Sequence, residues 1–96
     1  MQVLDKRYKK NPDIVFRKIA EESILVPISN NVGDLQSIYT LNEVASRIWE
    51  LIDPEISLTR IRDKLAEEFD VSVKEAEQDL KEFLDNLLRI KGIEEV

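Results

Sequence analysis

Carboxylates are the side chains in this sequence best able to do chemistry, because histidine and cysteine are both absent. A pair of carboxylates could serve as general acid and base, or could bind a metal ion. The candidate groups are Glu67 with Glu68, Glu75 with Glu77 and Asp79, and Glu82 with Asp85. All fall on predicted solvent-facing sides of helices, and none belongs to a calcium-loop pattern. We therefore predict that the chain is not an enzyme, has no catalytic residues and uses neither a metal nor a cofactor.

Composition excludes other kinds of reactive site. The lack of cysteine removes thiolate nucleophiles and structural zinc sites. The only glycines, Gly33 and Gly92, are too few to form a phosphate-binding loop. The lack of cysteine also suits a reducing compartment. Because the sequence has neither an apolar signal-peptide core nor an apolar run of about 20 residues, we expect a cytoplasmic protein with no membrane partner.

The length and the charge pattern predict one small domain with a basic arm. The 96 residues are 43% hydrophobic and 35% charged, as in an ordinary globular domain. Residues 1–18 hold six basic and two acidic side chains, whereas the rest holds eight basic and eighteen acidic ones. We predict that residues 1–13 form a basic arm and that residues 14–96 form a single acidic domain. A solvated arm is favoured over the alternative, an arm that binds nucleic acid or an acidic partner surface. Such a domain would repel a phosphate backbone.

Three short strands are predicted before any helix. Residues 14–19, 23–28 and 36–41 are rich in β-forming side chains and are separated by brief turn or loop segments. Because parallel pairing needs long crossovers, these links predict an antiparallel meander. Pro27 has no N–H to donate, so it is predicted at an edge position or at the end of the second strand.

Two helices follow the strands directly. The first starts either at Asn42, as N-cap, or at the overlapping capping box Thr40-x-x-Glu43. It ends before Pro54, because proline disfavours a helical residue ahead of it. The second helix is predicted at about residues 58–69, with Ser57 as its cap. A strand edge and a helix start are thus joined without a flexible linker.

The third helix has the clearest start signal, the capping box Ser72-x-x-Glu75. It is predicted to continue to about Lys91, where Gly92 stops it. Its apolar positions are Val73, Ala76, Leu80, Phe83, Leu84, Leu87, Leu88 and Ile90. That stripe is broader than the core obviously requires. The predicted fold class is α+β and winged-helix-like, a three-stranded antiparallel sheet followed by three helices.

A winged-helix outline is compatible with DNA binding through the third helix. In this chain the predicted helix carries four basic and five acidic side chains, a net of −1. A DNA reader would need several uncompensated lysines or arginines there. A winged-helix transcription regulator is therefore the alternative function, and we do not expect nucleic acid as the partner.

The same outline also suits β-augmentation, in which an extended peptide pairs with an exposed sheet edge. The third predicted strand would supply the edge, with Ile38 or Tyr39 on the groove floor. Leu80, Leu84 and Leu87 of the third helix would form the wall. The alternative is that these side chains are all internal core. A further alternative is an interaction domain that binds another protein but no extended peptide.

Three stretches of this chain resemble a known family. They are Tyr39-x-Leu41-Asn42-Glu43-x-Ala45-x-x-Ile48-Trp49-Glu50-Leu51-Ile52, then Ser57-x-x-x-Ile61-x-x-x-Leu65 with Phe69-Asp70-Val71, then Asp79-x-x-x-Phe83-Leu84-x-x-Leu87. Over roughly residues 14–93 the chain resembles the pyrroloquinoline quinone (PQQ) biosynthesis protein D family. The resemblance implies a winged-helix-like peptide chaperone, also called a RiPP recognition element. Such modules bind the leader of a ribosomally made precursor peptide and deliver it to a modifying enzyme, a radical S-adenosylmethionine (SAM) protein in the namesake pathway.

The resemblance also implies a binding site by position. The leader would add as a strand beside Ser37, Ile38, Tyr39, Thr40 and Leu41. The facing positions of the third helix would be drawn from Ala76, Leu80, Lys81, Leu84 and Leu87. Since a free sheet edge could also pair with its own copy, we expect a monomer or a weak homodimer.

Overall fold

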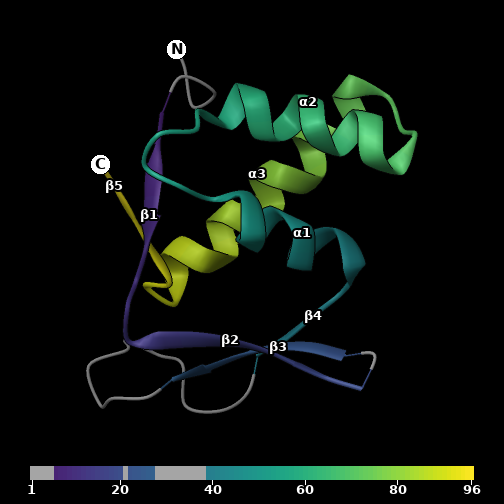
Figure 1. Ribbon diagram of the computed structural model, residues 1–96. Coiled ribbons are helices and arrows are strands. Elements are labelled where there is room, and N and C mark those ends of the chain that lie inside the picture. The colour runs from purple at the N-terminus through teal and green to yellow at the C-terminus, as the bar shows by residue number, and fades with distance from the viewer. Residues whose placement is uncertain (1–5, 21, 28–38) are drawn as a thin grey trace.

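The computed structural model describes residues 6–20, 22–27 and 39–96. In chain order the elements are β1 (Tyr8–Lys10), β2 (Ile14–Ile19), β3 (Glu22–Pro27), β4 (Tyr39–Leu41), α1 (Glu43–Leu51), α2 (Leu58–Phe69), α3 (Val73–Arg89) and β5 (Ile93–Glu95). The three helices gather on one face of the β2-β3-β4 sheet (Figure 1). This confirms the predicted class, an α+β fold with a three-stranded antiparallel sheet followed by three helices.

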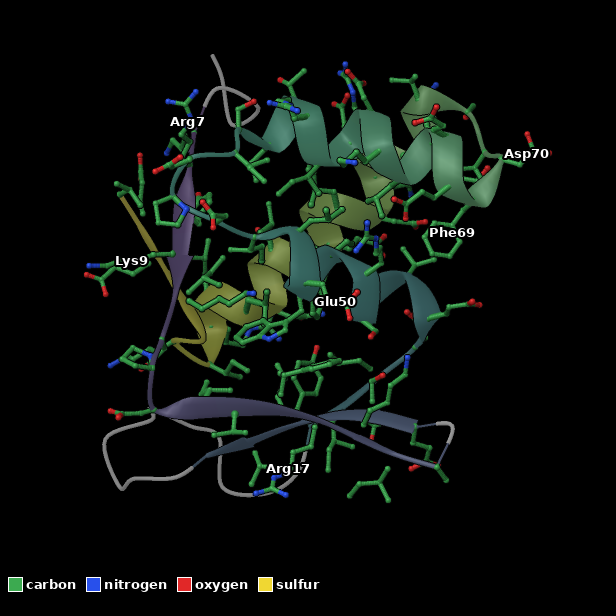
Figure 2. The ribbon with its side chains drawn as sticks, viewed as in Figure 1. Arg7, Lys9, Arg17, Glu50, Phe69 and Asp70 are labelled. Atoms are coloured by element: carbon green, nitrogen blue, oxygen red, sulfur yellow. The ribbon has the colours of Figure 1, made fainter. Side chains whose placement is uncertain are left out.

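The three-stranded sheet has the order β2-β3-β4, with both pairs antiparallel. Pro27 lies opposite Ile14 at the end of β3, and among the described residues the pairs with β4 involve Ser23, Ile24 and Leu25. It therefore takes the second of its two predicted positions, where its missing N–H leaves the ladder to β4 intact. Arg17 points away from the helices, so that side of the sheet carries a charged side chain (Figure 2).

The junction between β4 and α1 is rigid because the cap residue is itself extended. Asn42 has φ −78° and ψ −178°, and its side-chain oxygen accepts a hydrogen bond from the Ala45 N–H at 2.8 Å. Of the two predicted helix starts, the structure uses Asn42. A buried hydrogen bond of 3.0 Å between the hydroxyls of Ser46 and Ser23 then ties α1 to β3. The strand edge and the first helix consequently form one unit.

The later helices begin where the capping residues predict. The hydroxyls of Ser57 and Ser72 accept hydrogen bonds from the N–H groups of Arg60 and Glu75, at 3.4 and 3.0 Å. At the end of α3 the left-handed residue is Lys91, with φ 61°, and the Gly92 N–H donates to the Leu87 carbonyl at 2.7 Å. This is a Schellman-type ending. Gly92 follows the left-handed residue instead of providing it, and α3 itself ends at Arg89.

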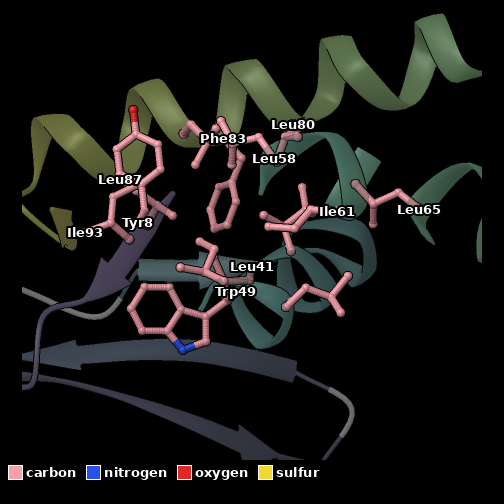
Figure 3. Packing of buried hydrophobic residues seen from close by; sticks show 14 of the residues in the cluster. Tyr8, Leu41, Trp49, Leu58, Ile61, Leu65, Leu80, Phe83, Leu87 and Ile93 are labelled. Carbon is pink, nitrogen blue, oxygen red and sulfur yellow. The ribbon is translucent and has the colours of Figure 1, made fainter. Parts of the chain in front are cut away.

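The hydrophobic core lies among the three helices and between them and the sheet (Figure 3). Its buried members are Tyr8, Ile14, Leu25, Leu41, Ile48, Trp49, Leu51, Ile52, Leu58, Ile61, Leu65, Ala76, Leu80, Phe83, Leu84, Leu87 and Ile93. Phe83 extends from α3 toward Leu41 of β4 (Figure 3). Every strand and helix contributes to this cluster, so the position of β4 relative to α3 is set by close packing.

A second, two-stranded sheet joins the two ends of the described chain, as Figure 1 shows. β1 pairs antiparallel with β5, with Lys9 opposite Glu94. The Asn11 backbone N–H adds a bond to the Gly92 carbonyl at 2.9 Å. The sequence predicts a solvated arm over residues 1–13, whereas residues 8–10 form a strand and Tyr8 is buried. The difference has a physical cause, because β1 is a strand through its pairing with β5, which lies at the other end of the described chain.

Lys10 shows how a basic side chain from this segment is accommodated. Its ammonium nitrogen lies 5.5 Å from the centroid of the Trp49 ring, within reach of a cation–π interaction. Burial lowers the pKa of Lys10, and the nearby carboxylates of Asp53 and Glu50 oppose that shift. The lysine stem therefore packs on the domain while its charge stays near acidic groups.

Replacing Tyr8 with leucine is expected to lower the free energy of unfolding by about 1–2 kcal/mol, because the ring is lost from a packed site. Urea unfolding followed by Trp49 fluorescence would measure the change. Lys9→Ala, on the exposed side of the same strand, is the control and should cost less than about 0.5 kcal/mol. Equal effects from both substitutions would show that β1 does not pack on the core.

An ion pair fastens α1 to α2 beside the sheet. Arg47 donates to both carboxylate oxygens of Glu68, at 2.7 and 2.9 Å, and to Glu50 at 3.3 Å. The hydrogen bond from Arg47 lowers the pKa of Glu68. Because the pKa is lower in the folded than in the unfolded chain, the stabilisation is present above the ordinary value of 4.5 and is lost as the pH falls through the folded value.

We expect Glu68→Gln to destabilise the domain by up to about 1 kcal/mol at pH 7, since both partners are partly exposed. The difference from the wild type should shrink as the pH is lowered from 7 through the lowered pKa of Glu68, because the wild type then loses the carboxylate charge that the variant lacks at every pH. Denaturant unfolding across that pH range is the measurement. Glu67→Gln is the control, since Glu67 has no ion pair within the described structure. A Glu68→Gln effect that does not change with pH would contradict the role given to this pair.

Candidate functional site

A groove of about 250 Å³ runs between β4, the start of α1 and one side of α3. Its lining residues are Tyr39, Thr40, Leu41, Asn42, Val44, Ala45, Ile48, Asp79, Glu82, Phe83 and Asn86. The three elements that form it are held together by the core, by the Asn42 cap and by the buried serine pair. The groove is therefore a preformed feature of the fold.

β4 gives the groove an unpaired backbone edge. Among the described residues, β4 has a hydrogen-bonded neighbour only on its β3 side. Alternate backbone N–H and C=O groups of such a strand point outward and can pair with an added strand. Thr40 is exposed, Tyr39 is half-buried and Leu41 is buried, as the alternation along a strand requires. An extended chain is the ligand shape that this edge can bind.

Part of the groove floor is apolar, although the accessible lining as a whole is mostly polar. The rings of Tyr39 and Phe83 are tilted by 37° with centroids 6.5 Å apart, which links β4 to α3. Ile48 lies beneath the floor with none of its surface exposed, and the half-buried Val44 and Ala45 supply the accessible apolar surface along α1. These side chains can bind an apolar side chain of a ligand by excluding water.

The wall supplied by α3 is polar. Asp79, Glu82 and Asn86 line it, with Asp79 and Asn86 half-buried and Glu82 exposed. Together with Phe83 they follow an i, i+3, i+4, i+7 spacing, so they form one stripe along the helix. No lysine or arginine is among the lining residues. Within the part of the chain that the structure describes, the groove therefore combines a free backbone edge, a partly apolar floor and an acidic wall.

A larger hollow of about 780 Å³ lies beside the ends of β2 and β3 and against α1 and α2. Its lining includes Arg47 and Glu68, whose charges already neutralise each other through the paired hydrogen bonds. The hollow extends to Leu41 and Asn42, but the remaining lining comes from the hairpin and the helices. Because no residue of α3 and only Leu41 of β4 are part of that lining, the groove along β4 is the better candidate for binding an extended chain.

The structure brings together only part of the predicted site. Tyr39, Thr40 and Leu41 line the groove, whereas Ser37 and Ile38 lie outside the described residues. The four apolar positions predicted on the third helix are core residues with 0–3% of their surface exposed, namely Ala76, Leu80, Leu84 and Leu87. This agrees with the alternative that they are internal core. Their part in peptide binding stays a prediction.

Lys81, the last predicted site residue, lies on a different face of α3. Its ammonium group pairs with Glu77 at 3.1 Å. It borders a shallow hollow on the outer side of the helix, together with Val73, Lys74 and Gln78. Val73 is 47% exposed, so this outer side includes an apolar side chain. Lys81 therefore does not line the groove beside β4.

Three groove residues on α3 were not predicted from the sequence, although the sequence contains a pattern that marks them. Asp79, Glu82 and Asn86 interrupt the edge of an otherwise apolar helical stripe that includes Phe83. A polar run at helical spacing beside a core stripe marks a boundary between core and surface. The apolar stripe of α3 has such a boundary on each side. Which of the two faces β4 depends on how α3 is rotated about its own axis, and the sequence pattern does not give that rotation.

Metal clusters and membrane-spanning helices are both missing from the described parts of the chain. Over residues 6–20, 22–27 and 39–96, no group of three or more acidic side chains is placed so that it could hold a metal ion. In the same ranges no helix combines the length and the apolar character needed to cross a bilayer.

Fold and site together define a small winged-helix-like α+β domain with an open strand edge beside a helix-walled groove. The chain belongs to the coenzyme PQQ synthesis protein D (PqqD) family, whose model matches residues 22–91. It is also similar to a solved structure of TbiB1 in complex with the TbiA(beta) leader peptide. That match has 27% sequence identity and a TM-score of 0.72, and it covers 90% of this chain and 94% of the other. No curated protein matches the sequence. The family resemblance seen in the sequence is thereby confirmed.

Proposed function

We propose that this chain binds the leader segment of a ribosomally made precursor peptide and presents it to a modifying enzyme. The observation that carries the proposal is the likeness, over 90% of the chain, to TbiB1, which was solved in complex with a leader peptide. Membership of the PqqD family supports the same role. The free edge of β4 beside an apolar floor is the feature of this chain that suits such a ligand.

In the proposed mechanism the leader pairs with β4 as an additional strand. Main-chain hydrogen bonds would supply affinity that does not depend on sequence, and every second side chain would enter the groove. Phe83 and Ala45 are placed to contact an apolar side chain there. Ser37 and Ile38 would extend the paired segment, as the family resemblance implies.

The chain would act as a carrier and would do no chemistry itself. Holding the leader raises the effective concentration of the attached core peptide at a bound enzyme. By the family resemblance, we propose a radical SAM protein as that enzyme and PQQ or a related peptide product as the outcome. A nucleic acid is a poor alternative ligand, because the chain has a net charge of −6 and the groove presents two carboxylates.

The proposal can be tested by titrating ¹⁵N-labelled protein with a synthetic leader of the precursor peptide encoded beside its gene. Backbone amide shifts are expected at Tyr39–Leu41 and at Val44, Ala45 and Asn86, which surround the groove. β5 is the internal control, because it is a short strand in the separate β1-β5 sheet. A leader that shifts β5 while β4 stays silent, or that binds nowhere, would rule out the proposed function at this site.

A further inference from the structure

We infer that the groove selects peptides that carry a lysine or arginine two positions away from an apolar side chain, so that both side chains lie on the face of the extended peptide that enters the groove. The inference rests on the proposed function, because it specifies which peptide the same groove accepts. It starts from the composition of the lining, where Asp79 and Glu82 are the only charged side chains among the residues that the structure describes. A cation brought in by the ligand would therefore meet Asp79 within the groove and Glu82 at its rim, where Glu82 also borders the outer hollow that Lys81 lines.

The two carboxylates are available for an incoming charge. Within the described structure neither Asp79 nor Glu82 has an ion pair, whereas Glu77 on the next turn pairs with both Arg62, at 3.5 Å, and Lys81, at 3.1 Å. Lys81, which precedes Glu82 in the sequence, is thus already paired with Glu77 on the outer face of the helix. The groove carboxylates remain without a positive partner until a ligand brings one.

The geometry limits where the basic side chain can sit. Asp79 to Asn86 spans about 10 Å along the helix axis at 1.5 Å per residue. An extended peptide covers that distance in about three residues, and residues two apart point to the same side. One apolar side chain over Tyr39 and Phe83 would therefore be accompanied, two positions away, by a side chain that reaches the acidic wall.

One feature of the site acts in the opposite direction. The N-terminus of α1 borders the groove and carries a partial positive charge, which would favour a ligand carboxylate. That charge is already offset, because Asn42 accepts the Ala45 N–H and Glu43 lies in the first turn. Two full negative charges on the α3 wall outweigh what remains of a helix dipole. The net preference is for a basic side chain.

Selection from a phage-displayed library of random 12-residue peptides would test the inference even before the natural leader is identified. Wild-type protein is expected to enrich peptides in which a lysine or arginine lies two positions away from an apolar residue. The best of these, made synthetically, should bind Asp79→Asn/Glu82→Gln about tenfold more weakly, because an ion pair covered by the ligand is lost. Its affinity for the wild type should also fall as salt rises.

The control is Glu67→Gln/Asp85→Asn, which changes the net charge equally at exposed positions outside the groove lining. It should leave the affinity within about twofold. If the selected peptides shift β4 amides but show no excess of lysine or arginine, or if both double variants weaken binding equally, the inference is wrong while the proposed function stands. If no selected peptide shifts β4 and the leader also fails to do so, both are wrong.

Discussion

Replacing Ala45 with tryptophan is expected to weaken leader binding by at least about 100-fold, equivalent to about 2.7 kcal/mol. Ala45 lies half-buried on α1 where it lines a groove of only about 250 Å³. An indole at this position would occupy the space that a peptide side chain must enter, and close-packed sites do not tolerate that overlap. Fluorescence anisotropy of a labelled leader would measure the loss. The fold should be retained, because the new side chain points into open space and costs about 0.5 kcal/mol in helix propensity.

Gln78→Trp is the matched control for this blocking experiment. Gln78 is exposed on α3 and borders the outer hollow next to Lys81 instead of the groove. The leader affinity of this variant should stay within about threefold of the wild type. The opposite outcome, in which Gln78→Trp abolishes binding and Ala45→Trp does not, would move the site to the outer face of α3. That result would support the predicted contact with Lys81 and contradict the groove.

Replacing Leu80 with alanine is expected to lower the free energy of unfolding by about 3 kcal/mol, within the usual range of about 2–5 kcal/mol for a buried leucine. Leu80 has 0% of its surface exposed and sits in the core between α3 and the rest of the domain. The loss combines the transfer free energy of the removed carbons with the cavity that they leave. Urea unfolding followed by Trp49 fluorescence gives the stability directly.

This substitution also separates two interpretations of the third helix. If Leu80 is core, its loss should leave the leader affinity of the folded fraction within about threefold. If Leu80 is a ligand contact, as the family resemblance implies, the affinity should fall by much more. Leu88→Ala is the control on the same helix, because Leu88 is 43% exposed and should cost less than about 1 kcal/mol. A large stability loss at Leu88 with little at Leu80 would show that the assigned rotation of α3 is wrong.

The helices were predictable because their signals are local. Ser57 and Ser72 cap α2 and α3 through bonds to residues three positions later, and Asn42 caps α1 in the same way. Such bonds need only neighbouring residues, so the sequence contains all of the information. The antiparallel order β2-β3-β4 was predictable for a related reason, since short links permit few other pairings.

The terminal sheet was not predictable in the same way. Tyr8–Lys10 has no apolar alternation that marks a strand, and its partner Ile93–Glu95 lies at the opposite end of the described chain. A basic tripeptide beside a turn is typical of a solvated arm. Only packing of Tyr8 into the core, with the backbone bonds to β5, makes it a strand.

The amino-acid sequence by itself determined the fold class, the helix caps, the family and the strand that borders the groove. The tertiary structure decided which side of α3 faces that strand. Leu80 and Leu87 belong to the core and Asp79 and Glu82 to the groove, although all four lie on one helix. The physical reason is that neighbouring stripes of a helix are separated by only a fraction of a turn. Their assignment depends on how side chains from several distant elements pack together, and no local pattern records that.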